Sequence, residues 1–167
     1  TPRTLMTNSA QDAERFLRRS IATEPGVARH HLALGELLAG VQLHDFAVDV
    51  FAEALRLEPD SIQALRALAR SALAAGRGAD AEHAARRLTL AAPGTDSFNV
   101  LAGALRAQDK LEEALQAADE AVARDPADIA ATHTRAIILA RIGQNDEALL
   151  VLDGLTARGV AAPALAF

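Results

Sequence analysis

The sequence contains no cysteine, tryptophan or tyrosine, and its five phenylalanines are its only aromatic residues of the Phe, Trp and Tyr set. Without cysteine, neither a disulfide framework nor a thiolate metal site can form. The shortage of aromatic side chains argues against a stacking surface for single-stranded nucleic acid. The net charge of −5 also disfavours binding to a phosphate backbone. We therefore expect no nucleic-acid partner.

Long apolar runs are missing as well. No stretch reaches the ~18 residues that a membrane-spanning helix needs, and the apolar segment 136–140 is flanked by Arg135 and Arg141. The first residues show no secretory signal, although the chain begins with Thr1 rather than Met. We expect no membrane partner and a cytoplasmic location, with the periplasm left open.

Motifs for catalysis and metal binding are also absent. The sequence has no HExxH motif, no histidine pair four residues apart, no GxSxG elbow and no GxxxxGK or GxGxxG loop. The paired carboxylates at 112–113 and 119–120 fall in a helix surface pattern, without an apolar pocket to shift their pKa. We expect no cofactor, no metal and no enzymatic activity.

What the sequence does have is a period. Four prolines, Pro25, Pro59, Pro93 and Pro126, stand 34, 34 and 33 residues apart. Each ends a run of helix formers, because proline disfavours helix at the residue before it and lacks an N–H group to donate. A constant spacing of this size predicts a tandem structural repeat.

Each period contains two apolar helical faces. In residues 28–61 the faces lie on either side of Gly40 and consist of Leu34, Leu37 and Leu38, then Ala47, Val50, Phe51, Ala54 and Leu55. Equivalent breaks fall at 76–78, at 108–110 and at Gly143. Each repeat is therefore predicted to be two antiparallel helices, with alanines where the helices cross and approach closely.

The repeat at 28–61 resembles the tetratricopeptide repeat, whose signature it matches at Leu34-Gly35, Ala47, Phe51 and Pro59. The other repeats match in register, although Arg135 stands where leucine is usual. The resemblance implies an all-α fold, a right-handed superhelix (α-solenoid) of antiparallel helix pairs. Helical repeats of the HEAT type, the alternative, have a longer period of about 40 residues or more.

The predicted organisation is a single tetratricopeptide-like domain over residues 1–167. It comprises a half repeat at 8–27, full repeats at 28–61, 62–94, 95–128 and 129–162, and the start of a further helix at 163–167. The last full helix carries apolar residues on more than one face, which favours a longer protein with more repeats or another domain after Phe167.

The resemblance also implies a binding surface, because the first helix of each such repeat lines the concave groove. Arg66 and Arg70 are four residues apart and so project from one helical face. Guanidinium groups bind carboxylates with two parallel hydrogen bonds. We therefore predict that the groove binds an extended, acidic peptide. The predicted contact residues are Arg66, Arg70, Leu73, Asn99, Arg106, His133, Ile137 and Arg141.

The function expected from these features is a non-catalytic scaffold for protein–protein interaction. One alternative is an accessory region of a larger bacterial enzyme, such as a sulfotransferase or a 2-oxoglutarate oxygenase, whose catalytic domain lies beyond residue 167. A second alternative is self-association into a homo-oligomer through the apolar terminal helices. The candidate residues for that contact are Phe16, Leu17, Leu150 and Leu152.

Overall fold

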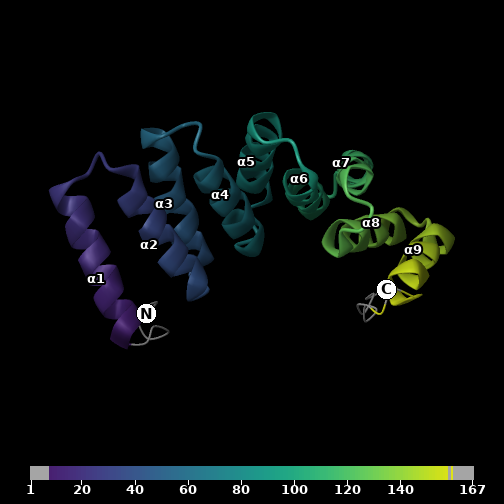
Figure 1. Cartoon of the computed structure of the whole chain (residues 1–167), viewed down its shortest axis with the longest axis horizontal. Helices are drawn as coiled ribbons and strands as arrows, with labels where there is room; N and C mark the ends of the chain where they lie inside the picture. The colour runs from purple at the N-terminus through teal and green to yellow at the C-terminus, as the bar shows by residue number, and fades with distance from the viewer. Residues whose placement is uncertain (1–7, 158, 160–167) are drawn as a thin grey trace. The chain divides into compact units, whose positions relative to one another are not determined.

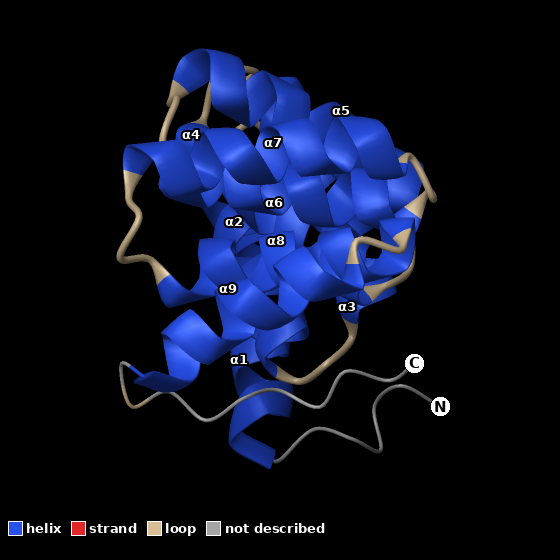
Figure 2. Cartoon of the chain, turned by 90° about the vertical axis from the view of Figure 1, so that its right-hand side faces the viewer, coloured by secondary structure: helices blue, strands red, loops and turns tan. Residues whose placement is uncertain are grey.

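The computed structural model describes residues 8–157 and 159. Within these residues all regular secondary structure is helical, as Figure 2 shows, so the all-α prediction is confirmed. None of the described helices is long and apolar enough to cross a membrane. The predicted helix start at 163–167 lies outside the described residues. In order along the chain (Figure 1), the helices are α1 (Asn8–Thr23), α2 (Ala28–Gly40), α3 (His44–Leu57), α4 (Ile62–Ala74), α5 (Gly78–Ala91), α6 (Thr95–Ala107), α7 (Leu111–Arg124), α8 (Ile129–Ile142) and α9 (Asn145–Ala157).

The helices fall into two compact units, one ending at Ala91 and the other beginning at Ala92. In the first unit, consecutive helices from α1 to α5 pack against each other, and α2 also contacts α4. In the second unit, α6 to α9 do the same, and α6 also contacts α8. The predicted helix pairs are thus present as α2–α3, α4–α5, α6–α7 and α8–α9.

Helices α4 and α8 begin at side-chain caps. The Ala64 N–H donates to the Ser61 hydroxyl at 3.4 Å, and the Ala131 N–H donates to the Asp128 carboxylate at 2.7 Å. Each cap satisfies one of the N–H groups that the first helical turn leaves without a partner. Because both caps follow closely after a periodic proline, the sequence sets where one repeat stops and the next begins.

The same turn joins the two helices of every pair. At each turn one residue adopts a left-handed conformation, with φ between 60° and 95°: Gln42, Gly76, Asp109 and Gly143. The next residue then donates its N–H to the carbonyl five residues earlier, as Leu43 to Leu38, Arg77 to Ala72, Lys110 to Leu105 and Gln144 to Leu139, at 2.8–3.0 Å. This Schellman geometry satisfies a carbonyl at the helix end. The backbone therefore repeats with the same period as the sequence.

Alanine and leucine fill the cores of both units. Several alanines have no exposed surface, among them Ala47, Ala69, Ala72, Ala81, Ala85, Ala102, Ala118 and Ala136. The largest fully buried side chains are Phe51, Leu34, Leu65 and Leu88 in the first unit and Leu105, Ile138, Leu139 and Leu155 in the second. Small residues let neighbouring helices approach closely, while the larger side chains fill the space beside them.

Gly35 marks a close helix contact in the first unit. A Cβ atom at this position would lie 2.4 Å from Cε1 of Phe51, well inside van der Waals contact. The phenylalanine ring is 1% exposed and occupies the space that a larger residue would need. The Gly35–Phe51 pair of the repeat signature is therefore one packing contact between α2 and α3.

Arginines bridge neighbouring helices at the surface. Arg135 of α8 donates to Asp119 of α7 at 2.6 Å and to Glu147 of α9 at 2.7 Å. This double ion pair explains how an arginine occupies a position where the repeat usually has leucine. Arg77 makes a similar bridge in the first unit, to the carboxylates of Asp49 and Asp80.

Candidate functional site

The structure places the predicted contact residues on three helices and outside the cores. Arg66, Arg70 and Leu73 lie on α4 of the first unit, Asn99 and Arg106 on α6 of the second, and His133, Ile137 and Arg141 on α8 of the second. Arg70 and Arg141 are exposed, and the other six are half-buried. All eight side chains therefore retain surface that a partner could contact.

Three of the residues in the second unit lie on α6 and α8, two helices that contact each other. We call Asn99, Arg106 and His133 the α6–α8 cluster. Each has one buried side-chain atom with no hydrogen-bond partner among the described residues: Oδ1 of Asn99, Nε of Arg106 and Nε2 of His133. Buried polar atoms in native proteins nearly always have partners. These three atoms are therefore the strongest candidates in this unit for ligand contacts.

Arg106 is the charged member of the α6–α8 cluster. Burial lowers the pKa of His133 below its usual value, and the positive charge of Arg106 lowers it further. His133 is thus largely neutral at pH 7, when one ring nitrogen donates and the other accepts. Within the described part of the chain, no carboxylate pairs with the Arg106 guanidinium, so its charge is available to a ligand.

Arg141 has a different environment. Its guanidinium donates to the Asp109 carboxylate at 2.6 Å and to the Arg106 backbone carbonyl at 3.3 Å. These bonds fasten the end of α8 to the end of α6. A ligand would have to share Arg141 with Asp109, whereas it would meet no such competitor at Arg106.

The corresponding surface of the first unit lies on α4, beside α2. Gln63, at the start of α4, donates a hydrogen bond to the Glu36 carboxylate of α2 at 2.8 Å. Further along α4, Arg66 is half-buried and Arg70 is exposed. This surface therefore combines two arginines, four residues apart, with an acidic side chain that is already hydrogen-bonded.

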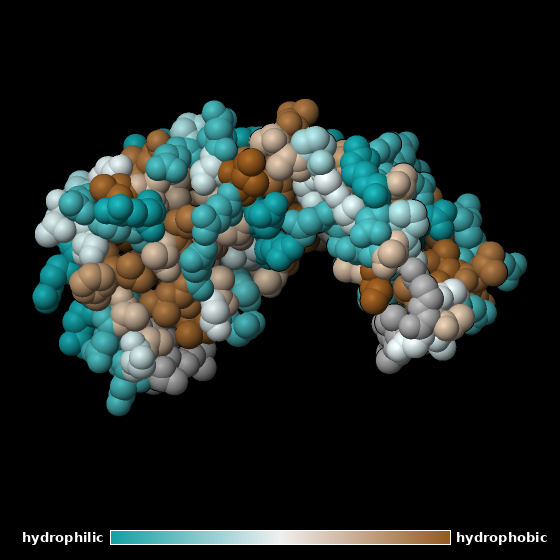
Figure 3. Space-filling view, viewed as in Figure 1, coloured by the Kyte–Doolittle hydropathy of each residue, from teal (hydrophilic) through white to brown (hydrophobic). Residues whose placement is uncertain are grey.

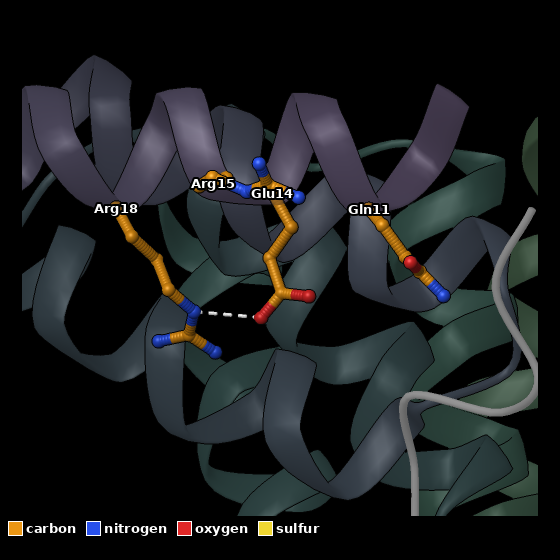
Figure 4. A pocket seen from close by; sticks show the side chains of 4 residues that line it. All are labelled: Gln11, Glu14, Arg15 and Arg18. Carbon is orange, nitrogen blue, oxygen red and sulfur yellow. Dashed lines mark hydrogen bonds and ion pairs between the residues drawn. The ribbon is translucent and has the colours of Figure 1, made fainter. Parts of the chain in front are cut away.

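A pocket of about 380 Å³ lies beside α1, and the described residues that line it are Gln11, Glu14, Arg15 and Arg18. Glu14 is only 7% exposed, and Figure 4 shows that Arg18 reaches its carboxylate, at 2.6 Å. A buried carboxylate needs such a partner to offset its desolvation. Because the ion pair is internal, the pocket presents little uncompensated charge.

A second pocket of the first unit, about 350 Å³, has an apolar floor that includes Val48, Leu55 and Leu68. Two of the charged side chains at its rim already have partners within the chain. Arg77 forms ion pairs with two aspartates, and Arg87 donates a hydrogen bond to the Pro59 carbonyl. This rim therefore offers less free hydrogen-bonding capacity than the α6–α8 cluster. Among the described residues, no group of three or more His, Asp or Glu side chains could hold a metal ion.

The terminal helices expose large apolar side chains. Phe16 of α1 is 69% exposed, and Leu149 and Leu150 of α9 are 50% and 71% exposed. Figure 3 shows hydrophobic surface over α9. Leu152, expected to join a self-association surface, is instead buried against Ala136 and Leu155. That expectation was wrong for Leu152, because its side of α9 packs against α8.

Comparison with known proteins agrees with this architecture. Residues 66–129 match the family model described as tetratricopeptide repeat. A solved structure of MamA from Desulfovibrio magneticus RS-1 is 22% identical, with a TM-score of 0.82 over 90% of this chain and 85% of that one. YrrB, described as a TPR protein with an unusual peptide-binding site, is 21% identical, with a TM-score of 0.67 over 84% of this chain and 73% of that one. No curated protein sequence matches the chain significantly.

A third solved structure is TTC0263, a thermophilic TPR protein in Thermus thermophilus. It is 26% identical, with a TM-score of 0.66 over 78% of this chain and 74% of that one. The family match, these similar folds and the repeated helix pairs all agree with the resemblance seen in the sequence. Residues 66–129 of this chain match the tetratricopeptide-repeat family, and the described part of the chain has the fold of tetratricopeptide-repeat proteins.

Proposed function

We propose that this protein is a non-catalytic scaffold that binds an extended acidic peptide through the first helices of its repeats. Tetratricopeptide-repeat proteins act as protein-interaction scaffolds. The observation that carries the proposal is the division of α4, α6 and α8 into two faces. One face of each helix is buried in the core through alanine and leucine, and the other presents Arg, Asn or His outside it.

Charge supports an acidic partner. The whole chain carries a formal net charge of −5, yet two arginines lie on α4 and Arg106 lies unpaired by any described carboxylate on α6. Positive side chains on the proposed binding helices of an otherwise acidic protein favour an anionic partner and disfavour a basic one. Guanidinium groups suit carboxylates in particular, because their planar N–H groups match the two oxygens.

The similar fold of YrrB supports a peptide as the form of the ligand, since that protein is described as having a peptide-binding site. An extended segment also suits helices that each contribute only a few side chains, because it reaches successive helices without a structure of its own. The side chains of the peptide then determine which residues of the helices it contacts.

The test is fluorescence anisotropy with labelled peptides, using a panel of acidic sequences and matched versions with Asn for Asp and Gln for Glu. We expect the acidic peptides to bind at least about tenfold more tightly than their amide versions, and salt to weaken that binding. The double variant Arg66→Gln, Arg70→Gln should bind more weakly. The double variant Arg56→Gln, Arg86→Gln is the control, because it removes two arginine charges from α3 and α5, which lie outside the proposed surface. Equal binding of acidic and amide peptides would contradict the proposal.

Self-association is a second candidate function, supported by the exposure of Phe16 and Leu150 on the two terminal helices. Sedimentation velocity over a range of concentrations tests it. We expect larger species at high concentration for the wild type and fewer for Phe16→Ser or Leu150→Ser. A monomer at every concentration would rule this function out.

A further inference from the structure

We infer that the pocket between α3 and α5 binds a small molecule, an aliphatic chain that ends in a carboxylate. We call this pocket the α3–α5 groove. Side chains of α3 and α5 form its walls, and its apolar floor includes Val48, Leu55 and Leu68, each less than 9% exposed. Its volume of about 350 Å³ falls within the range of small-molecule sites. The site is separate from the proposed peptide surface, which uses the polar sides of α4, α6 and α8.

The equivalent space in the second unit is filled by an arginine. An offset of 67 residues relates the left-handed turn residues of the first unit to those of the second. The same offset pairs Leu68 with Arg135, Ala52 with Asp119 and Asp80 with Glu147. Arg135 donates to Asp119 of α7 at 2.6 Å and to Glu147 of α9 at 2.7 Å, so its side chain spans the space between these helices. Leucine and alanine cannot make such bonds, and the space in the first unit stays open as the α3–α5 groove.

The charges around the two spaces also differ. His83 and Arg87 line the α3–α5 groove and are four residues apart on α5, so they project from one helical face. Among the described residues neither forms an ion pair, and Arg87 donates only to the neutral Pro59 carbonyl. Their equivalents 67 residues later are Leu150 and Gly154, which have no charge. The second unit thus holds a cation between carboxylates, whereas the first has an apolar floor beside a guanidinium, and this complements an apolar anion.

Both ends of the α3–α5 groove are bridged by arginines. At one end Arg77 forms ion pairs with Asp49 of α3 and Asp80 of α5. At the other end Arg87 of α5 donates to the carbonyl of Pro59, which follows α3. From residue 80 to residue 87 the helix advances by about 10 Å. A short ligand fits between the bridges, whereas a longer peptide would have to break one. A guanidinium has several N–H donors, so Arg87 can bind a carboxylate and keep its bond to Pro59.

The test is a titration of the full chain with hexanoate, followed by ¹H–¹³C NMR of methyl groups. Three related ligands separate the chemical groups: hexanamide has the chain without the charge, acetate has the charge without the chain, and hexylammonium has the opposite charge. We expect hexanoate to shift the methyl signals of Val48, Leu55 and Leu68. Its dissociation constant should be at least about fivefold lower than those of the other three ligands, and salt should weaken its binding.

Two variants test the residues. Arg87→Gln should weaken hexanoate binding at least about threefold and leave hexanamide binding unchanged. Arg86→Gln is the matched control, because Arg86 lies next to Arg87 on α5 but bonds Glu82 and does not line the groove. The double variant Ala52→Asp, Leu68→Arg copies the filled space of the second unit and should abolish the hexanoate shifts. Circular dichroism shows whether each variant is folded, and Arg87→Gln decides the test if the double variant is not.

Equal binding of hexanoate and hexanamide, or equal binding of hexanoate to the wild type and to Arg87→Gln, would overturn the inference. Hexanoate shifts that do not include the three floor residues, or no saturable shift up to about 50 mM, would overturn it as well. The proposed function is tested separately by the labelled peptides. Failure of the acidic peptides with specific hexanoate binding would refute the proposed function alone, and the reverse result would refute this inference alone.

Discussion

The substitution Gly35→Ala tests the packing of the repeat most directly. An added Cβ would lie 2.4, 2.6 and 2.8 Å from three ring carbons of Phe51. Carbon atoms pack at about 3.5–4.0 Å, so the ring would have to withdraw by roughly 1 Å. Because the ring is 1% exposed, it has no solvent to move into and would displace its neighbours. Overpacking of this kind costs about 1–3 kcal/mol.

A second effect opposes the clash. Alanine is more favourable than glycine inside a helix by about 1 kcal/mol. The expected net result is a loss of up to about 2 kcal/mol in the free energy of unfolding. Gly154→Ala in α9 is the matched control, because Gly154 is exposed and a Cβ there would have nothing within 4 Å. The free energy of unfolding of Gly154→Ala should rise by about 1 kcal/mol, which is the preference for alanine over glycine in a helix.

Urea unfolding followed by circular dichroism compares the two variants with the wild type. We expect Gly35→Ala to be less stable than the wild type and Gly154→Ala to be more stable. In a Phe51→Leu background the smaller side chain leaves room, so Gly35→Ala should cost less there, which a double-mutant cycle would detect. A gain in stability for Gly35→Ala as large as that for Gly154→Ala would refute the packing argument.

Four further substitutions test other features. Gln42→Gly should raise the free energy of unfolding by about 0.5 kcal/mol, because the relief of left-handed backbone strain at Gln42 outweighs the added flexibility of the unfolded chain. Gly76→Ala should lower the free energy of unfolding, because alanine is strained in the left-handed conformation. Urea titration of both variants would check these two predictions. Arg135→Ala should destabilise by about 1 kcal/mol at low salt, since it removes two partly exposed ion pairs, and the loss should shrink in 1 M salt (about 3 Å screening length); a loss that does not depend on salt would contradict this. For His133 the folded-state pKa lies below the ordinary value of 6.5, so its contribution to stability is present above pH 6.5 and is lost as the pH falls through the folded-state pKa. Thermal unfolding should therefore show a steeper loss of stability below pH 6.5 for the wild type than for His133→Gln, and equal pH profiles would contradict the assignment.

The helix pairs were predictable from the sequence because the signals that specify them are local. The proline period and the apolar spacing in residues 28–61 define helix ends and buried faces before any tertiary contact is known. The left-handed turn residues were only half predictable. Glycine marks the position at Gly76 and Gly143, but Gln42 and Asp109 adopt it under the constraint of the closed turn.

The polar details depended on contacts that the sequence does not encode locally. The helical spacing in α1 suggested an apolar contact face, yet its one buried residue is Glu14, which forms an ion pair with Arg18. The unsatisfied atoms of the α6–α8 cluster depend on how α6 packs against α8, across an intervening helix. Sequence position suggested that Asn99, Arg106 and His133 face a ligand, but only the structure separates Arg106 from the bonded Arg141.

The equivalence of the four turns has a consequence for how such a chain can change length. Gln42, Gly76, Asp109 and Gly143 stand at intervals of 34, 33 and 34 residues, each just before the residue that donates its N–H to the carbonyl five residues earlier. Deletion of residues 42–75 would join Val41 to Gly76 and put a left-handed residue where one is required. A deletion or duplication of one whole period therefore keeps every turn in register, whereas a change of any other length would place a helical residue in the turn. Recombination between repeats is the kind of mutation that this architecture tolerates best.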